Sequence, residues 1–257
     1  NPSFSQQTNF LNLTFFDEDK FSHIRLGQIP MLSYEYALDY DEKLSEKENF
    51  KLKEGCGSVY CFGGRKFGKT LCVEKLDLLV SFINNPGEDC GFSSYDALHI
   101  RGVLEDIIQV LEYHPFFSMF EAKVNRSPTY RFFLKNGYKL DGVNMNLSGE
   151  NPGGQFFQKH FKRLYIEEAS FETEEINKKR LESVSENGCV FRIAGMTNFT
   201  RYSPAGKVFY DLTKHQLIVN LPQYVNPKWD EKEKEKAVRD HSGEDSISYR
   251  VFVKGEI

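Results

Sequence analysis

The sequence predicts an α/β fold, a mostly parallel β-sheet flanked by helices, with a small subdomain appended at its carboxyl end. Short apolar runs rich in β-favouring residues alternate with helical patterns, and a glycine-rich turn joins the first run to a helix. Residues 221–257 differ in composition from the rest, with two prolines and a dense run of charges. Strands that alternate with helices form parallel sheets covered on both faces.

The expected elements follow in chain order. Strands are predicted at residues 58–62, 90–94, 130–133, 143–147, 161–166, 189–194, 216–220 and 251–253. Helices are predicted at 68–83, 95–113 and 173–184, with Ser93 and Ser94 capping the second and a further helical stretch near 34–46. Asn136-Gly137 is a typical turn between two strands.

These elements predict three parts. Residues 1–55 form an N-terminal segment that packs on the core, residues 56–220 form the core, and residues 221–257 form a linker or lid subdomain. With 257 residues the chain is long enough for one large α/β domain or a core with a small companion.

Composition excludes several classes of protein. The net charge of −4 argues against a nucleic-acid coat, so any DNA contact must come from local basic patches. The five cysteines lack metal-ligand spacing, which argues against a disulfide framework and a structural zinc site. No apolar run approaches the roughly 18 residues of a membrane span, so no membrane association is expected.

A phosphate-binding loop is the strongest motif in the chain. The pattern G-x-x-x-x-G-K-[ST] is matched by Gly63, Gly64, Arg65, Lys66, Phe67, Gly68, Lys69 and Thr70. Its glycines let backbone N–H groups point at phosphate oxygens at the positive end of the following helix. Lys69 is expected on the β- and γ-phosphates, and Thr70 is expected to ligate Mg²⁺. Strand, glycine-rich turn and helix together predict a P-loop NTPase.

Carboxylates at the end of the strand predicted at 161–166 complete a hydrolytic site. We assign Glu167 to the metal and Glu168 to the attacking water, as its general base. Arg65 is expected to stabilise charge on the γ-phosphate. Thr197 and Asn198 follow the strand predicted at 189–194, and are expected to act as a polar sensor of that phosphate.

The motifs resemble those of one family, the ATPase motor of the large terminase subunit of tailed bacteriophages. The resemblance covers most of the chain and rests on the P-loop with its early arginine, residues 92–97, the acidic motif at 164–169, and residues 195–198 with the segment behind them. It implies a RecA/ASCE-like P-loop NTPase fold. It also implies Mg²⁺-dependent ATP hydrolysis that drives double-stranded DNA into a preformed capsid.

The resemblance carries further expectations. Partners are duplex DNA, the portal protein, the small terminase subunit and other copies of the chain, which form a pentameric ring on the capsid and are monomers in isolation. The location is the cytoplasm of the infected bacterial host, and a nuclease domain follows residue 257. Adenine contacts come from a glutamine before the P-loop, for which Gln28 is the candidate.

Two departures from the family pattern stand out. The first acid is usually Asp, whereas Glu167 is longer by about 1.5 Å, one C–C bond. The family also supplies an arginine to the neighbouring subunit from just before the acidic motif, where this sequence has none. Arg101, Arg126, Arg131 and Arg163 are the alternatives, and the sequence does not choose among them.

Two other functions compete with the motor. One is a P-loop phosphotransferase, such as a nucleoside or small-molecule kinase. A kinase lacks a dedicated carboxylate for water, so the pair Glu167-Glu168 favours hydrolysis. The other is a binding module switched by nucleotide, which Lys69 and Glu168 argue against.

Overall fold

A computed structural model of the chain describes residues 59–66, 68–70, 75, 77–146, 149–184, 190–194, 217–226 and 228–256. Within these residues, eight strands form one sheet in the order β3-β4-β5-β2-β6-β7-β1-β8. The strands are β1 Val59–Gly63, β2 Asp89–Ser94, β3 Lys123–Asn125, β4 Arg131–Phe133, β5 Lys139–Asn144, β6 Arg163–Ile166, β7 Val190–Ala194 and β8 Leu217–Leu221.

The sheet is mostly parallel, as the sequence predicts. All pairs from β5 through β2, β6, β7 and β1 to β8 are parallel, and β4 pairs antiparallel with both β3 and β5. β7 separates β1 from β6. Because parallel strands end at the same edge of a sheet, the loops that follow β1 and β6 leave the sheet at the same edge, one strand apart.

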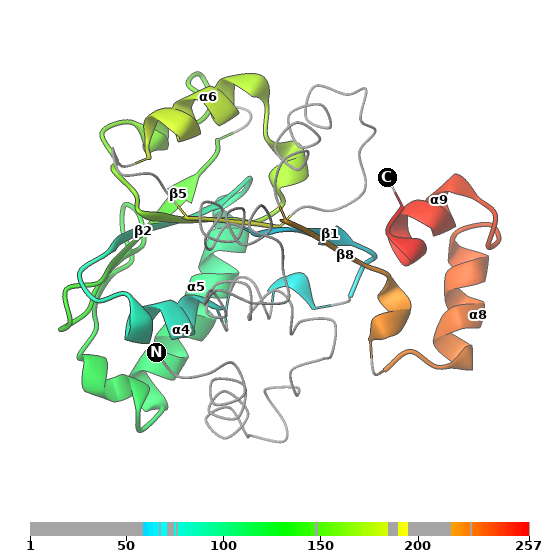
Figure 1. The fold of residues 1–257 in the computed structure, drawn as a ribbon, viewed down its shortest axis with the longest axis horizontal. Coiled ribbons are helices and arrows are strands. Elements are labelled where there is room, and N and C mark those ends of the chain that lie inside the picture. Colours follow the sequence, from blue (N-terminus) through cyan, green and yellow to red (C-terminus); the bar gives the residue numbers. More distant parts are fainter. Residues whose placement is uncertain are drawn as a thin grey trace, which may run out of the picture.

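Helices cover both faces of the sheet (Figure 1). The helices α4 Asp77–Asn84 and α5 Ala97–Tyr113 lie on one face, and α6 Glu174–Glu182 lies on the other. Short 3₁₀ turns connect the elements: η3 Phe117–Phe120, η4 Gly154–Phe156 and η5 Ala169–Phe171. Lys69, Thr70 and Lys75 are helical too, as expected after a P-loop.

Two apolar layers hold the helices on the sheet. β6 serves both, since Tyr165 belongs to the layer under α4 and α5 whereas Leu164 and Ile166 belong to the layer under α6. Successive residues of a strand point to opposite faces, so a strand buried on both sides is apolar throughout. This explains why Leu164, Tyr165 and Ile166 of β6 are all apolar, while the buried Arg163 at its start pairs with Glu88.

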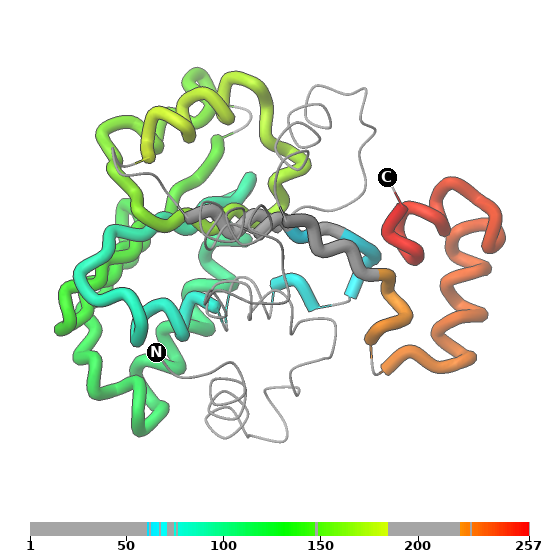
Figure 2. The backbone as a smooth tube through the Cα atoms, in the orientation of Figure 1, coloured from blue at the N-terminus to red at the C-terminus, as the bar shows by residue number. Residues whose placement is uncertain are grey.

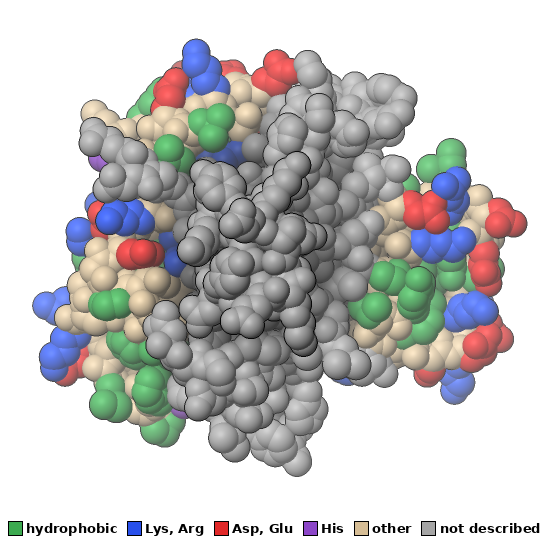
Figure 3. Space-filling view, viewed as in Figure 1, with side chains coloured by type: hydrophobic (Ala, Val, Ile, Leu, Met, Phe, Trp, Pro, Cys, Tyr) green, Lys and Arg blue, Asp and Glu red, His purple; other side chains and the backbone are tan. Residues whose placement is uncertain are grey.

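The C-terminal part lies beyond β8 at the edge of the sheet. It comprises η6 Gln223–Val225, α8 Glu231–Asp240, α9 Ile247–Tyr249 and the π-helical turn η7 Arg250–Lys254. The chain runs through η6 into these helices (Figure 2). It has its own small apolar cluster of Ala237, Tyr249 and Val253. Acidic and basic side chains are interspersed over its surface (Figure 3).

Within the described residues the predicted order of elements is confirmed, with β5 at Lys139–Asn144 in place of 143–147 and with three further corrections. The cap of α5 is Asp96, which accepts a hydrogen bond from the backbone N–H of Leu98, because Ser93 and Ser94 complete β2. The strand predicted at 251–253 is wrong. Tyr249 and Val253, four residues apart, share one buried face, which is helical spacing.

The third correction is β3, a short edge strand that the sequence analysis missed. Residues 1–55 lie outside the described part of the chain, so the proposed N-terminal segment and the domain boundaries stay predictions. None of the helices in the described ranges has the length and apolarity needed to cross a membrane.

Candidate nucleotide-binding site

The carboxyl edge of the sheet brings the predicted site residues together. Gly63 ends β1 and opens the phosphate loop, and Glu167-Glu168 follow β6 directly. The backbone N–H of Glu167 donates to the carbonyl of Ser93 at 2.8 Å, which ties the first acid to the end of β2. The acids therefore sit on a rigid part of the sheet, opposite the loop.

Two contacts join the loop to the acids. The ammonium of Lys69 lies 3.7 Å from Oε1 of Glu168, and both side chains are largely buried. The hydroxyl of Thr70 donates to Oε1 of Glu167 at 3.3 Å. Residues nearly a hundred positions apart in the chain thus form one polar cluster, in which the two predicted metal ligands, Thr70 and Glu167, are in direct contact.

Glu168 has an unusual backbone and an unusual environment. Its φ of 53° and ψ of 42° are left-handed, a conformation that costs a non-glycine residue about 1 kcal/mol or more and that often occurs at functional sites. Burial raises the pKa of its carboxyl above the ordinary range, the charge of Lys69 lowers it, and the charge of Glu167 raises it further. A buried base with a raised pKa takes up a proton more readily than an exposed glutamate.

Anchors on both sides hold this segment in place. The Tyr165 hydroxyl donates to Oδ2 of Asp77 at 2.8 Å, which links β6 to the start of α4. Behind the acids, Glu172 and Arg180 form a fully buried ion pair with a Nε–Oε1 distance of 2.6 Å. The short turn that carries Glu168 is therefore fixed at each end.

The C-terminal part packs against the outer side of the phosphate loop. The backbone N–H of Arg65 donates to the carbonyl of Phe252 at 2.8 Å, and the Asn226 amide donates to the carbonyl of Lys66 at 2.8 Å. A Cβ on Gly64 would lie 2.5 Å from backbone atoms of Gln223 and Val253. The phosphate-loop pattern assigns this glycine to phosphate binding, and in the structure close packing requires it as well.

Arg65 lies differently from its expected role. Its guanidinium carbon is 4.5 Å from the centroid of the Phe252 ring, a cation–π contact on the C-terminal side of the loop. A contact with the γ-phosphate would require the side chain to leave this ring, and that role stays a prediction.

The oxygen atoms here suit Mg²⁺. This cation prefers oxygen ligands, usually one or two carboxylates with water and substrate phosphates completing the shell. Thr70 and Glu167 supply a hydroxyl and a carboxylate at the same point, and Oε2 of both Glu167 and Glu168 is buried without a hydrogen-bond partner among the described residues. In the described ranges no cluster of three or more His, Cys, Asp or Glu side chains forms an all-protein metal cage.

One neighbour of Glu167, His99, was not predicted from the sequence. Nδ1 of His99, in the first turn of α5, lies 3.7 Å from Oε2 of Glu167. The spacing of Tyr95 and His99, four residues apart at the start of a helix after β2, was a signal that they share a face.

Several predicted residues lie outside the described part of the chain: Gln28, Phe67, Thr197 and Asn198. Their roles stay predictions.

Three of the four candidate arginines for a neighbouring site are in ion pairs. Arg126 pairs with Glu105, Arg131 with Asp141, and the buried Arg163 with Glu88. Arg101 is exposed on α5, and no ion pair links it to a described residue.

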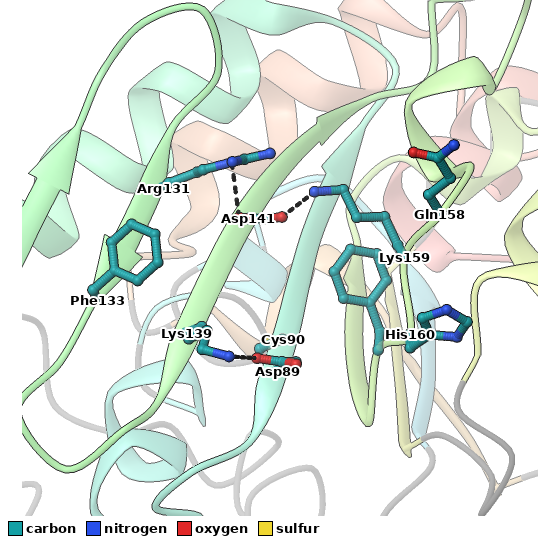
Figure 4. Close-up of a pocket in the computed structure, with 10 residues that line it drawn as sticks. Asp89, Cys90, Arg131, Phe133, Lys139, Asp141, Gln158, Lys159 and His160 are labelled. Atoms are coloured by element: carbon teal, nitrogen blue, oxygen red, sulfur yellow. Dashed lines mark hydrogen bonds and ion pairs between the residues drawn. The ribbon is translucent and has the colours of Figure 1, made fainter.

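A polar pocket of about 260 Å³ lies toward the amino ends of β2 and β5, away from the phosphate loop. Arg131 and Lys159 flank Asp141, and Lys139 pairs with Asp89 (Figure 4). Its charges therefore largely neutralise one another. The basic side chain of Lys159 is paired here and is not a free cation.

No protein-family model matches the chain, and no curated protein matches it in sequence. Several solved structures match the chain in fold. The large terminase from a thermophilic bacteriophage matches with a TM-score of 0.66 and 13% identity over 91% of this chain and 53% of that chain.

Two further structures support the same comparison. The HK97 bacteriophage large terminase matches with a TM-score of 0.58 and 9% identity over 90% of this chain and 55% of that chain. The large terminase ATPase domain of Thermus phage P74-26 matches with a TM-score of 0.52 and 10% identity over 77% of this chain and 87% of that chain.

The chain spans about half the length of the first two of these proteins and most of the P74-26 domain. At these identities the comparison concerns the fold. This chain has the P-loop NTPase fold of the ATPase domain of phage large terminases.

Proposed function

We propose that this chain binds ATP and hydrolyses it to ADP and phosphate. The observation that carries the proposal is the convergence of two loops at one edge of the sheet. Lys69 and Thr70 arrive from β1, and Glu168 and Glu167 arrive from β6. A phosphate-binding lysine that faces a buried glutamate with a raised pKa is an arrangement suited to hydrolysis rather than to binding alone.

The residues divide the chemistry between them. The phosphate loop holds the triphosphate through its backbone N–H groups, and Lys69 neutralises charge on the β- and γ-phosphates. Glu168 orients a water molecule and accepts its proton as the water oxygen attacks the γ-phosphorus. The bond from the γ-phosphorus to the bridging oxygen breaks, and ADP leaves with the electron pair.

Thr70 and Glu167 would hold the divalent cation that accompanies ATP. When bound there, Mg²⁺ neutralises phosphate charge and favours the developing charge of phosphoryl transfer.

We propose further that hydrolysis drives double-stranded DNA into a preformed viral capsid. The fold likeness to phage large terminases and the motifs of the P-loop and acidic strand support this role. The partners would be duplex DNA, a portal protein, a small terminase subunit and further copies of this chain in a ring. The site of action would be the cytoplasm of an infected bacterium.

Phosphate release with and without duplex DNA tests both levels of the proposal. We expect Mg²⁺-dependent release of phosphate from ATP, abolished by Lys69→Ala and increased by duplex DNA. Lys139→Ala is a matched control, because it removes a lysine from the distant pocket.

Two outcomes would contradict the proposal. Transfer of the γ-phosphate to a nucleoside or another small acceptor instead of water would assign the chain to the phosphotransferases. If duplex DNA does not change the rate of hydrolysis, either for this chain or for a longer protein that contains it, the proposed motor function is rejected. The proposed ATPase activity would still stand.

A further inference from the structure

Glu167 is contacted from two sides. The Thr70 hydroxyl donates to its Oε1, and His99 Nδ1 lies 3.7 Å from its Oε2. The Glu167 side chain is only 5% exposed, and Oε2 has no hydrogen bond within the described part of the chain. A buried carboxylate oxygen without a donor is costly, and a movement of less than about 1 Å would bring the imidazole N–H into hydrogen-bond distance.

The imidazole is itself held by a second side chain. The hydroxyl of Tyr95 lies 3.0 Å from His99 Nε2. The Tyr95 ring packs on His99 at a centroid distance of 4.8 Å and on Phe171 at 4.7 Å. Phe171 belongs to the turn that follows Glu168, so Tyr95 lies between the imidazole and the acidic segment.

These contacts favour one arrangement of protons. Burial raises the pKa of the Tyr95 phenol, and the charges of Asp96, Glu168 and Glu167 raise it further, so the phenol keeps its proton and can donate it. A phenol that donates to Nε2 leaves the ring proton on Nδ1, which faces Glu167. The Glu167 carboxylate near Nδ1 favours the same tautomer, so the contacts on both sides of the ring are compatible with a donor that faces Glu167.

We propose that His99, oriented by Tyr95, is a positioning residue that fixes the Glu167 carboxylate for the divalent cation bound with the nucleotide. The inference rests on the proposed function and names two residues that neither the P-loop nor the acidic motif contains. A side chain that hydrogen-bonds a metal ligand typically contributes about 10–100-fold to metal affinity. Glu167 would thus be oriented by α5 as well as by its own strand.

Binding of a fluorescent ADP analogue, measured with Mn²⁺ and with EDTA, tests this proposal without requiring turnover. The gain in affinity on adding Mn²⁺ reports the protein's metal ligands. We expect His99→Ala to reduce that gain by about 10-fold or more and to leave the affinity in EDTA unchanged. Tyr95→Phe should reduce the Mn²⁺-dependent gain in affinity less than His99→Ala does. His99→Asn retains an N–H donor and should therefore keep most of the wild-type gain.

Two further variants make the result specific. Leu98→Ala alters an exposed neighbour on the same turn, and should leave the gain unchanged. In a Glu167→Gln background, which lacks the carboxylate, His99→Ala should have no additional effect, since the imidazole acts through Glu167. Thermal unfolding identifies variants that do not fold, and His99→Asn then decides the question.

Failure of this inference is distinguishable from failure of the proposed function. If the wild type binds the analogue no better than Lys69→Ala, the nucleotide site itself is rejected. If the wild type binds it and gains affinity with Mn²⁺, but His99→Ala gains equally, only the positioning role is overturned. An equal loss with Mn²⁺ and with EDTA also overturns it, because the imidazole would then support the pocket and not the metal.

Discussion

Lys69 and Glu168 form an ion pair, with 3.7 Å between Nζ and Oε1, although β7 lies between the strands that carry them. The same ammonium is the group assigned to the phosphates of ATP. Since one ammonium serves both partners, nucleotide binding is expected to draw Lys69 toward the phosphates. Loss of that neighbouring charge makes Glu168 a stronger base, because the ion pair lowers its pKa.

The first prediction concerns Glu168→Gln. The amide keeps the shape of the side chain but cannot accept the proton of water, so hydrolysis should fall by about 10²–10⁴-fold. Affinity for ATP should be retained, as measured by fluorescence titration beside single-turnover hydrolysis. Glu174→Gln, an exposed glutamate at the start of α6, serves as the control. Hydrolysis at the wild-type rate in Glu168→Gln would remove Glu168 from the role of base.

The second prediction concerns stability and pH, measured in EDTA. The folded pKa of Glu168 is raised by burial, so the folded state holds this proton more tightly than the unfolded chain does. The favourable contribution of protonated Glu168 to the free energy of unfolding is present below the pKa of the unfolded state. It is lost as the pH rises through the pKa of the folded state. Glu168→Gln should therefore raise the free energy of unfolding at neutral pH by about 0.5–2 kcal/mol.

That stabilisation should shrink as the pH falls toward about 4. Urea unfolding of both proteins across this range measures it. A difference that grows toward acid pH would have the wrong sign and would contradict the raised pKa.

The third prediction concerns the length of Glu167. The site holds the longer side chain with Thr70 at one carboxylate oxygen and His99 near the other. Glu167→Asp should lower Mg²⁺-dependent hydrolysis, because the carboxylate on the shorter side chain would no longer reach Thr70 and His99. The Mg²⁺ concentration for half-maximal hydrolysis is the measurement. Unchanged or higher activity would mean that the local geometry has not adapted to glutamate.

The fourth prediction concerns the buried pair behind the site. Glu172 and Arg180 are both fully buried, so Glu172→Gln removes the carboxylate charge of a buried ion pair and should destabilise the fold by about 3–5 kcal/mol. The Glu175–Lys179 pair on the same helix is exposed at its glutamate, and Glu175→Gln should change stability by less than about 0.5 kcal/mol. Equal effects in chemical denaturation would refute this assignment.

The fifth prediction concerns Gly64. An alanine Cβ there would collide with the backbone of Gln223 and Val253, so Gly64→Ala should destabilise the protein by about 1–3 kcal/mol. Gly102, on the exposed face of α5, has open space around it, and Gly102→Ala should stabilise the helix by about 0.5–1 kcal/mol. Thermal unfolding of the two variants should give shifts of opposite sign.

Local sequence patterns identified most strands and helices of the core, with the edge strand β3 as an exception. β6 is identifiable because Leu164, Tyr165 and Ile166 form an apolar run buried on both faces, and the P-loop because its glycines and lysine have fixed spacing. The strand prediction at 251–253 was wrong because an apolar pattern over three residues is too short to distinguish a strand from one turn of helix. Burial of Tyr249 with Val253 decides that case, and burial is a tertiary property.

By itself the sequence determined the fold class, the phosphate loop, and the acids that face it, since each depends on residue types at short, fixed spacings. Only the tertiary structure decided which distant side chains meet. It brought His99 to Glu167, placed Phe252 under Arg65, and packed Gln223 and Val253 against Gly64. Such contacts depend on how the sheet edges and the C-terminal helices pack, and no local pattern encodes the distance between residues far apart in the chain.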